Sequence, residues 1–482
     1  MLSDERTGYP DLRIPGYPEQ DCIMNGTLGS PENPLRVAVV GSGPSGFYAA
    51  ESLLQSDKSV TVDMFERLPA PYGLVRYGVA PDHPKIKNVI KIYERIAEKP
   101  GFAFLGNVNV GKDVSVRELK DFYDVVLLAY GAPSDRKLGI PGEDLPGSYT
   151  ATEFVAWYNG HPDYRDRKFD LSGKVAVVIG QGNVAADVCR ILCKTPEELK
   201  NTDIASYALE ALAQSKVQEV HMVGRRGPAQ AAFTPIEIRE FGELADCDPV
   251  VSPAELELNP ASRAELEIAK ELTRKKNIET LQKFASLGAS SKRKKFFVRF
   301  LRSPVEIKGG GRVERIVLEK NRLEGEPGRQ KAKGTGEKEE MACGLLFRSV
   351  GYHGVPTPGV PFDERAGVIP NQEGRVTESE RVVPGLYAAG WIKRGPTGVI
   401  GTNKADSNET VRHILEDAPQ LPPATRRDTR ALLESLKKKG VRVVSFPDWK
   451  RIDAREIARG VPAGKPREKF TSVAEMFSVL NS

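Results

Sequence analysis

A glycine turn early in the chain has the spacing that lets a backbone hold a phosphate group. Gly41, Gly43 and Gly46 form a G-x-G-x-x-G pattern directly after the apolar run of residues 36–40. In such a turn the first glycine allows a tight bend, the second lets the backbone approach a pyrophosphate, and the third lets helix and strand pack closely. The following helix presents unpaired N–H groups to the anion. The next apolar run ends at Glu66, twenty residues after Gly46, where a carboxylate can bind ribose hydroxyls.

A second glycine turn of the same kind occurs later in the chain, but its next strand ends differently. Residues 180–185, GQGNVA, follow the apolar run 175–179 and carry alanine at the third position, which the pattern allows. The next predicted strand, residues 217–223, is followed by Arg225 and Arg226 instead of an acid. Because a 2′-phosphate is a dianion near neutral pH, a carboxylate repels it and a guanidinium can bind it bidentately. The pattern favours NADPH as the ligand. The alternative is a pair of solvated arginines on a turn.

Two dinucleotide sites in one chain favour FAD in the first and NADPH in the second, because a flavin must receive hydride from a group bound beside it. A dithiol mechanism would need a redox cysteine pair and an iron–sulfur centre would need a cysteine cluster, and the five cysteines provide neither. Cys189 and Cys193 lie one helical turn apart among apolar residues and are predicted to belong to the core. The histidines are scattered singly, so no metal site is predicted.

The absence of internal relay centres favours a separate electron carrier as the partner. A flavin takes up two electrons as hydride and can release them one at a time, which suits a one-electron carrier of the ferredoxin class. Such carriers are acidic, so a basic docking face would attract them. The candidate residues for this face are Arg239, Lys275, Lys276, Lys292, Arg293, Lys294, Lys295, Arg299 and Arg302. For a run such as residues 292–295 the alternative is an ordinary solvated face.

The elements that must position these residues alternate between strands and helices, which predicts an α/β fold with two Rossmann-like dinucleotide-binding units. An extra helix is expected over residues 204–213, and one or two charged helices over residues 262–284. A strand is expected over residues 385–390 and a helix over residues 429–439. Residues 321–340, rich in Gly, Lys and Glu, are predicted to form a mobile loop because they lack apolar side chains to pack.

Composition excludes several other classes of protein. With 70 basic and 65 acidic residues, the net charge of +5 is too small to indicate a nucleic-acid-binding protein. No apolar run approaches the roughly 18 residues that a membrane-spanning helix needs, so a soluble or at most peripheral protein is predicted. Residues 1–34 are acidic and lack an apolar core segment, which predicts a flexible or partly docked extension and neither a secretory signal nor a typical transit peptide.

Six stretches of the sequence belong together as a pattern: VVGSGP (39–44), GLVRYGVAPDHP (73–84), IGQGNVA (179–185), VGRRGP (223–228), GWIKRGPTGVI (390–400) and GKPREK (464–469). Together they resemble the NADPH:adrenodoxin (ferredoxin) reductases of the mitochondrial type. The resemblance runs from about residue 35 to the C-terminus. The Gly-Trp pair at residues 390–391 replaces the Gly-Asp usual in disulfide reductases and separates the chain from those relatives.

The resemblance implies an FAD domain built from residues 35–137 and 360–482, with an NADPH-binding domain of residues 138–359 inserted in it. It places His83 and Asp187 near the flavin, as a pair linked to its proton and electron traffic. Ser45 stands where alanine is common. The FAD contacts implied are Gly41, Gly43, Ser45, Gly46, Glu66, Leu74, Val110, Trp391, Gly398, Val399 and Ile400. The NADPH contacts implied are Gln181, Gly182, Asn183, Val184, Arg225, Arg226, Glu237 and Gly398.

The activity implied by the resemblance is transfer of hydride from NADPH to FAD and of single electrons to a [2Fe–2S] ferredoxin or adrenodoxin, for mitochondrial cytochrome P450 or iron–sulfur and haem pathways. The implied location is the matrix side of the inner mitochondrial membrane, without a transmembrane segment. Two alternatives stay open. A flavin subunit that serves a synthase, such as glutamate synthase, normally carries a cysteine-rich domain that this chain lacks. The other alternative is a nucleotide-binding regulator that senses NADPH, and bleaching of a yellow flavin by NADPH would exclude it.

Overall fold

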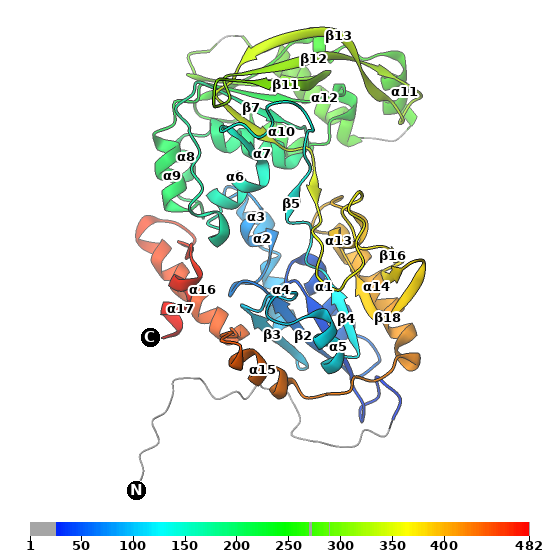
Figure 1. Ribbon diagram of the computed structural model, residues 1–482. Coiled ribbons are helices and arrows are strands. Elements are labelled where there is room, and N and C mark those ends of the chain that lie inside the picture. The colour runs from blue at the N-terminus through cyan, green and yellow to red at the C-terminus, as the bar shows by residue number, and fades with distance from the viewer. Residues whose placement is uncertain (1–25, 269–271, 289, 482) are drawn as a thin grey trace.

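The computed structural model describes residues 26–268, 272–288 and 290–481, which form two lobes (Figure 1). The first lobe, in the lower half of Figure 1, is built on a seven-stranded sheet, and the second lobe, in the upper half, on a six-stranded sheet. Most of the predicted N-terminal extension, up to residue 25, lies outside the described residues. Among the helices of the described residues, none is both long and apolar enough to cross a membrane.

The sheet of the first lobe has the order β16-β17-β18-β4-β1-β2-β3. Strand β1 lies in its interior in parallel register with β2 on one side and β4 on the other, and all six of its residues are buried. A strand with both neighbours paired and both faces covered is mostly apolar, which explains the run at this position, with Arg36 as the exception. The strands are β1 (Leu35–Val40), β2 (Val60–Glu66), β3 (Phe102–Gly106), β4 (Val125–Leu128), β16 (Asn371–Gln372), β17 (Arg375–Glu378) and β18 (Arg381–Ala388).

Helices from both ends of the chain cover the first sheet. Helix α1 (Pro44–Leu54) packs against α14 (Thr402–Asp417), so that segments far apart in sequence share one apolar core. The predicted helix over residues 429–439 is confirmed as α15 (Thr429–Lys438). The other helices of this lobe are α2 (Leu74–Tyr77), α3 (Pro84–Lys87), α4 (Ile90–Ala97), α5 (Val116–Phe122), α13 (Trp391–Arg394), α16 (Phe446–Gly460) and α17 (Val473–Leu480), with the 3-10 turns η4 (Ala418–Gln420) and η5 (Val461–Ala463).

The sheet of the second lobe has the order β6-β14-β7-β8-β10-β9, and all of its strand pairs are parallel. Cys189 and Cys193 are fully buried in its core, which confirms the structural role predicted for them. The strands are β6 (Ser148–Thr150), β7 (Val175–Ile179), β8 (Glu219–Val223), β9 (Cys247–Val251), β10 (Lys294–Arg299) and β14 (Leu345–Arg348). The helices are α6 (Ala151–Tyr158), α7 (Asn183–Cys193), α8 (Pro196–Leu199), α9 (Ser206–Ala213), α10 (Pro235–Glu240), α11 (Pro260–Ile268) and α12 (Leu272–Ala285), with the 3-10 turns η1 (Pro162–Tyr164), η2 (Pro228–Gln230) and η3 (Pro253–Leu256).

The predicted mobile loop over residues 321–340 is wrong. Strands β12 (Arg315–Glu324) and β13 (Lys331–Ala342) form an antiparallel hairpin across this segment, and β11 (Arg302–Lys308) completes a three-stranded sheet. One face of the sheet buries Ile316 and Leu318 completely. The other carries ion pairs between strands, such as Lys308 to Glu340 at 3.0 Å. Charged cross-strand pairs therefore take the place of the apolar residues whose scarcity suggested a loop.

Two short strands join the lobes. Strand β5 (Ser134–Asp135) leads from the first lobe to the second, and β15 (Tyr352–His353) leads back. They pair antiparallel with each other, with Ser134 opposite His353 and Asp135 opposite Tyr352. Both connections therefore run side by side through the middle of the molecule, where Figure 1 shows β5 between the lobes.

Candidate dinucleotide sites

The first glycine turn lies at the carboxyl end of β1, beside the end of β4. Gly41 has a φ of 108°, and a Cβ atom there would lie 2.6 Å from the carbonyl oxygen of Ala129. A Cβ atom at Gly46 would lie 2.0 Å from the carbonyl oxygen of Gly41, so both positions require glycine. Around Gly43, by contrast, no atom of the described residues outside its own chain neighbours lies within 4 Å of a Cβ position, and no side chain caps α1. The turn fits a pyrophosphate, which the N-terminus of α1 would stabilise.

Glu66 ends β2 beside this turn and is held there by hydrogen bonds. Its Oε2 accepts from the hydroxyl of Ser42 at 2.6 Å, and its Oε1 accepts from the N–H of Leu68 at 3.1 Å. This position suits contact with the ribose of a dinucleotide on the first turn. Ser45 lies in the first turn of α1, and its hydroxyl donates to Oδ1 of Asn403 at 3.1 Å. Asn403 is on α14 and was not predicted from the sequence, because it is remote from the glycine turn in the chain.

The second glycine turn has the same construction in the other sheet. Gly180 has a φ of 140°, and a Cβ atom there would lie 2.1 Å from the carbonyl oxygen of Ser349, which follows β14. Strand β14 therefore lies beside β7 and its glycine turn in the same way as β4 lies beside β1 and the first turn. Among the described residues, nothing beyond the adjacent chain lies within 4 Å of a Cβ position at Gly182. Asn183 and Val184 begin α7, and Oδ1 of Asn183 accepts the N–H of Thr234 at 2.8 Å.

Arg225 and Arg226 follow β8 beside the second turn, and both side chains are exposed. The turn and the arginine segment are in contact, because a Cβ atom at Gly224 would lie 1.9 Å from Oε1 of Gln181. The side chain of Asn321 in β12 donates to the carbonyl oxygen of Arg225 at 2.9 Å, so the hairpin supports this segment. Partial burial and the charge of Arg225 lower the pKa of Arg226. Two adjacent guanidinium groups at this place can bind a 2′-phosphate.

A fully buried arginine, Arg190 on α7, lies at the centre of the charged group that contains His83 and Asp187. Arg190 was not predicted from the sequence, although its position three residues after Asp187 on one helix was a signal for an ion pair. We call this group the Arg190 cluster. The guanidinium nitrogens of Arg190 lie close to oxygens of four carboxylates: Asp82 (2.8 Å), Asp187 (2.6 Å), Glu237 (2.9 Å) and Glu240 (3.3 Å).

His83 joins this cluster from the first lobe, at the start of α3. Its Nε2 is 3.0 Å from Oε2 of Glu240, whereas its Nδ1 is 3.9 Å from Oδ1 of Asp187 and 3.8 Å from Oε1 of Glu237. The predicted pair His83 and Asp187 therefore lies together, but the hydrogen bond of the imidazole is made to Glu240. Burial lowers the pKa of His83, but the hydrogen bond that His83 makes to Glu240 and the charges of Glu237 and Asp82 together outweigh it, so that the pKa is raised.

The carboxylates of the Arg190 cluster differ in their affinity for protons. Burial, strengthened by the charge of Asp187, raises the pKa of Glu237 to about 7. Burial also raises the pKa of Asp187. For Asp82, burial is outweighed by the hydrogen bonds and charges of Arg190 and Lys194 together, and the pKa is lowered. A group that titrates near neutrality beside a permanently charged one can take up and release a proton, as sites of proton handling require.

The raised pKa of Glu237 predicts a pH-dependent stability. Between the ordinary pKa of 4.5 and about 7, the folded protein binds a proton at Glu237 that the unfolded chain has lost. The stability that this proton contributes is therefore present below pH 4.5 and is lost as the pH rises through 7. We expect the free energy of unfolding of Glu237→Gln, relative to that of wild type, to rise by about 3 kcal/mol between pH 4.5 and 7. This follows from about 1.4 kcal/mol per pKa unit. Urea unfolding at both pH values measures the change.

The matched control for this experiment is Glu243→Gln, which changes an exposed glutamate just beyond the same helix. Its difference from wild type should stay constant across the pH range. A Glu237→Gln difference that is equally constant would show that Glu237 has an ordinary pKa in the folded protein.

The other predicted FAD contacts come from both ends of the first lobe. Leu74 begins α2, and Val110 is half-buried beyond β3. Trp391 begins α13, and its indole N–H donates to the carbonyl oxygen of Thr397 at 3.1 Å. Gly398 has a φ of 81°, and the side chain of Val399 beside it is 61% exposed. Exposed apolar groups of this kind offer surface that a flavin ring can cover.

Most of the predicted basic docking residues are already paired. Lys294 donates from Nζ to the carbonyl oxygen of Leu192 at 2.7 Å. Arg239, Lys275 and Lys276 are exposed on α10 and α12, and Arg239 lies 4.0 Å from Glu243. The ion pairs of the others are Lys292 to Asp248 (3.9 Å), Arg293 to Asp246 (2.6 Å), Lys295 to Asp248 (2.5 Å), Arg299 to Glu339 (2.8 Å) and Arg302 to Glu339 (3.0 Å). Lys275 and Lys276 are therefore the exposed members of the predicted set that have no ion pair among the described residues.

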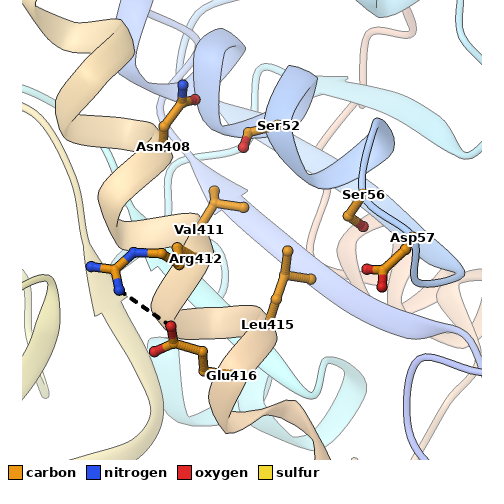
Figure 2. A pocket seen from close by; sticks show the side chains of 8 residues that line it. All are labelled: Ser52, Ser56, Asp57, Asn408, Val411, Arg412, Leu415 and Glu416. Atoms are coloured by element: carbon orange, nitrogen blue, oxygen red, sulfur yellow. Dashed lines mark hydrogen bonds and ion pairs between the residues drawn. The ribbon is translucent and has the colours of Figure 1, made fainter.

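A surface hollow of about 440 Å³ lies between α1 and α14 (Figure 2). Figure 2 shows Ser52, Ser56 and Asp57 on one wall, with Arg412 and Glu416, 3.2 Å apart, on the other. None of the glycines of the two turns lines it. The hollow is therefore separate from both dinucleotide sites.

Two Rossmann-like units, each with a glycine turn against the neighbouring strand, define a flavin- and pyridine-nucleotide-dependent oxidoreductase. Residues 35–235 accordingly match the family model for pyridine nucleotide-disulphide oxidoreductases. The chain belongs to the NADPH:adrenodoxin (ferredoxin) reductase family. It is 49% identical over 460 residues to the NADPH-ferredoxin reductase FprA of Mycobacterium tuberculosis, a match that covers 92% of this chain and 99% of that protein. The resemblance found in the sequence is confirmed.

Two further comparisons agree with this assignment. The chain is 45% identical over 485 residues to the mitochondrial NADPH:adrenodoxin oxidoreductase of Homo sapiens, covering 98% of this chain and 97% of that protein. The solved structure of Mycobacterium tuberculosis FprA in complex with NADPH superimposes with a TM-score of 0.88 at 48% identity, covering 93% of this chain and 100% of that chain. The predicted fold class is confirmed.

Proposed function

We propose that residues 35–137 and 360–482 bind FAD, that residues 138–359 bind NADPH, and that hydride passes from NADPH to the flavin. The single observation that carries this assignment is the opposite charge beside the two glycine turns. Glu66 favours a ribose with free hydroxyls, as in FAD, whereas Arg225 and Arg226 favour a ribose that bears a phosphate. As a member of its family, the chain is an FAD-dependent oxidoreductase that uses NADPH.

The protein contributes binding, orientation and proton handling, while the cofactors supply the redox chemistry. We assign the pyrophosphate of FAD to the N-terminus of α1 and that of NADPH to the N-terminus of α7. The flavin side is assigned to Trp391 and residues 398–400, on the segment that follows β18. In the Arg190 cluster, His83 and Asp187 would hold a proton near the reacting rings, with Glu237 and Glu240 as further acceptors.

The electron acceptor of this family is an iron–sulfur ferredoxin or adrenodoxin, according to the names of its members. For this chain we propose a [2Fe–2S] ferredoxin that serves cytochrome P450 or iron–sulfur and haem pathways. Exposed Arg239, Lys275 and Lys276 support docking of an acidic carrier. Bacterial and mitochondrial relatives match at similar identity, so the matrix location stays a prediction.

The test of this function combines purified holoprotein, NADPH, a [2Fe–2S] ferredoxin and cytochrome c. We expect cytochrome c reduction to depend on the ferredoxin and to be faster with NADPH than with NADH. The apparent KM for the ferredoxin should rise with salt, because exposed opposite charges are screened beyond about 8 to 10 Å at moderate ionic strength. Reduction at the same rate without ferredoxin would overturn the assigned partner, and a KM independent of salt would overturn the basic docking face.

The alternative of a flavin subunit in a synthase complex is not favoured. The matches to FprA and to the adrenodoxin reductases extend over more than nine-tenths of the chain. The four described cysteines are all buried and free, and none of the described residues forms a cysteine cluster that could hold an iron–sulfur centre.

A further inference from the structure

The GKPREK stretch, residues 464–469, lies between the two lobes. It follows α16 of the first lobe, where the N–H of Glu468 donates to the carbonyl oxygen of Glu456 at 2.9 Å. Its two lysines reach the second lobe. Nζ of Lys465 donates to the carbonyl oxygen of Ile204 at 2.7 Å, and Nζ of Lys469 donates to that of Asn159 at 3.1 Å. We call residues 464–471 the C-terminal strap.

Two lysines from separate segments of the first lobe bind one buried acid of the second lobe, Asp203. Nζ of Lys469, on the strap, is 3.0 Å from Oδ2 of Asp203. Nζ of Lys87, on α3, is 2.7 Å from Oδ1 of the same carboxylate. The side chain of Lys469 is 1% exposed and that of Asp203 is 8% exposed. Burial lowers the pKa of Lys469 to about 7, which agrees with its enclosure at this boundary.

Helix α3 is consequently held by the second lobe at both of its ends. At its start, His83 hydrogen-bonds Glu240, and at its last residue, Lys87 binds Asp203. The same carboxylate holds the strap, and Lys469 also donates to the carbonyl oxygen of Arg76 in α2 at 3.3 Å. Asp203 therefore ties α2, α3 and the strap to the second lobe. Loss of its charge would leave two largely buried lysines without this counterion.

We propose that Asp203 is a positioning residue for hydride transfer, which sets the alignment of the NADPH-binding lobe against the flavin-binding lobe by holding Lys87 and Lys469. This inference rests on the proposed function. A hydride donor and acceptor have to be aligned closely, and a misplacement of about 1 Å can reduce a rate about 100-fold. Asp203 contacts neither glycine turn, so its effect should fall on alignment instead of on cofactor affinity.

The test is Asp203→Asn, which keeps the size of the side chain and removes its charge. The control is Asp163→Asn, since Asp163 also links the lobes, at 2.7 Å from Arg67, but in an exposed pair. In anaerobic stopped-flow experiments with the holoprotein, we expect Asp203→Asn to lower the limiting rate of flavin reduction about 10- to 100-fold. The Kd for NADPH should stay within about twofold of wild type, because alignment and not binding is changed. The control should behave as wild type.

Hydrogen–deuterium exchange gives a readout that does not depend on activity. In Asp203→Asn, residues 84–90 and the strap should exchange about tenfold faster or more, since both segments lose a charged hydrogen bond to Asp203. Should Asp203→Asn fail to fold, Lys87→Met replaces it. That variant keeps the pair between Lys469 and Asp203, so it should speed exchange at residues 84–90 and leave the strap protected.

The outcomes separate the two hypotheses. Unchanged exchange, an unchanged limiting rate in Asp203→Asn, or an equal loss in Asp163→Asn would overturn the positioning role. If the flavin of the wild type is not reduced by NADPH at all, the proposed function fails, and the exchange data still decide whether Asp203 couples the lobes.

Discussion

Replacing Arg225 and Arg226 together by alanine is expected to raise the KM for NADPH about 100- to 1000-fold and to leave the KM for NADH within about twofold of wild type. Both guanidinium groups are exposed beside the second glycine turn. Each charged hydrogen bond to the 2′-phosphate contributes roughly 1.5–3 kcal/mol, and about 1.4 kcal/mol corresponds to a factor of ten. NADH lacks that phosphate, so it loses none of these bonds.

Steady-state kinetics with both coenzymes and a fixed ferredoxin concentration measure this effect. A useful control is Arg263→Ala, which changes an exposed arginine of the same lobe outside the turn. An equal loss of affinity for NADH and NADPH in the double variant would mean that the arginines support the fold of the turn. In that case the assignment of the phosphate site would be wrong.

Replacing Arg190 by methionine is expected to destabilise the protein by about 3–5 kcal/mol at pH 7. Arg190 is fully buried and is the shared partner of four carboxylates. Removing one partner of a buried ion pair leaves the opposite charge uncompensated, which is the costly case. The loss should shrink as the pH falls from 7, because Glu237, with a pKa of about 7, and then the other carboxyl groups become protonated and no longer need a cation.

Urea unfolding at pH 7 and at pH 4.5, followed by circular dichroism, measures the change. The control is Arg165→Met, which breaks an exposed ion pair with Glu475 and should cost at most about 1 kcal/mol at either pH. If Arg190→Met unfolds at the urea concentration of the wild type, then the four acids do not depend on this arginine.

The parts of the molecule that could be predicted from the sequence are those with a local physical cause. A glycine turn needs a small residue at each close approach, and Gly41 and Gly180 show this in φ and in contact with the neighbouring strand. The apolar runs at β1 and β7 form interior parallel strands of the two sheets, because a strand that is covered on both faces is mostly apolar. These signals lie within a few residues of each other, so a single sequence contains them.

The parts that could not be predicted depend on contacts between distant segments. Arg190 gathers acids from α7, from α10 and from the loop before α3, and only its spacing from Asp187 was visible beforehand. The hairpin β12–β13 is stabilised by charged pairs across strands, which a count of apolar residues does not detect. His83 was expected beside Asp187, but its hydrogen bond to Glu240 required the packing of two lobes.

The pairing of β5 with β15 bears on how such a chain can be assembled from parts. Because the strand that leads into the second lobe and the strand that leaves it lie side by side, both chain connections to this lobe lie at one place. Strands β4 and β18, on either side of this attachment in sequence, still pair directly with each other in the first sheet. The first sheet loses no strand pairing by carrying the second lobe, so a lobe of another size could be grafted between residues 135 and 352 without rebuilding this sheet, whereas the contacts of α3 and the strap would have to be replaced.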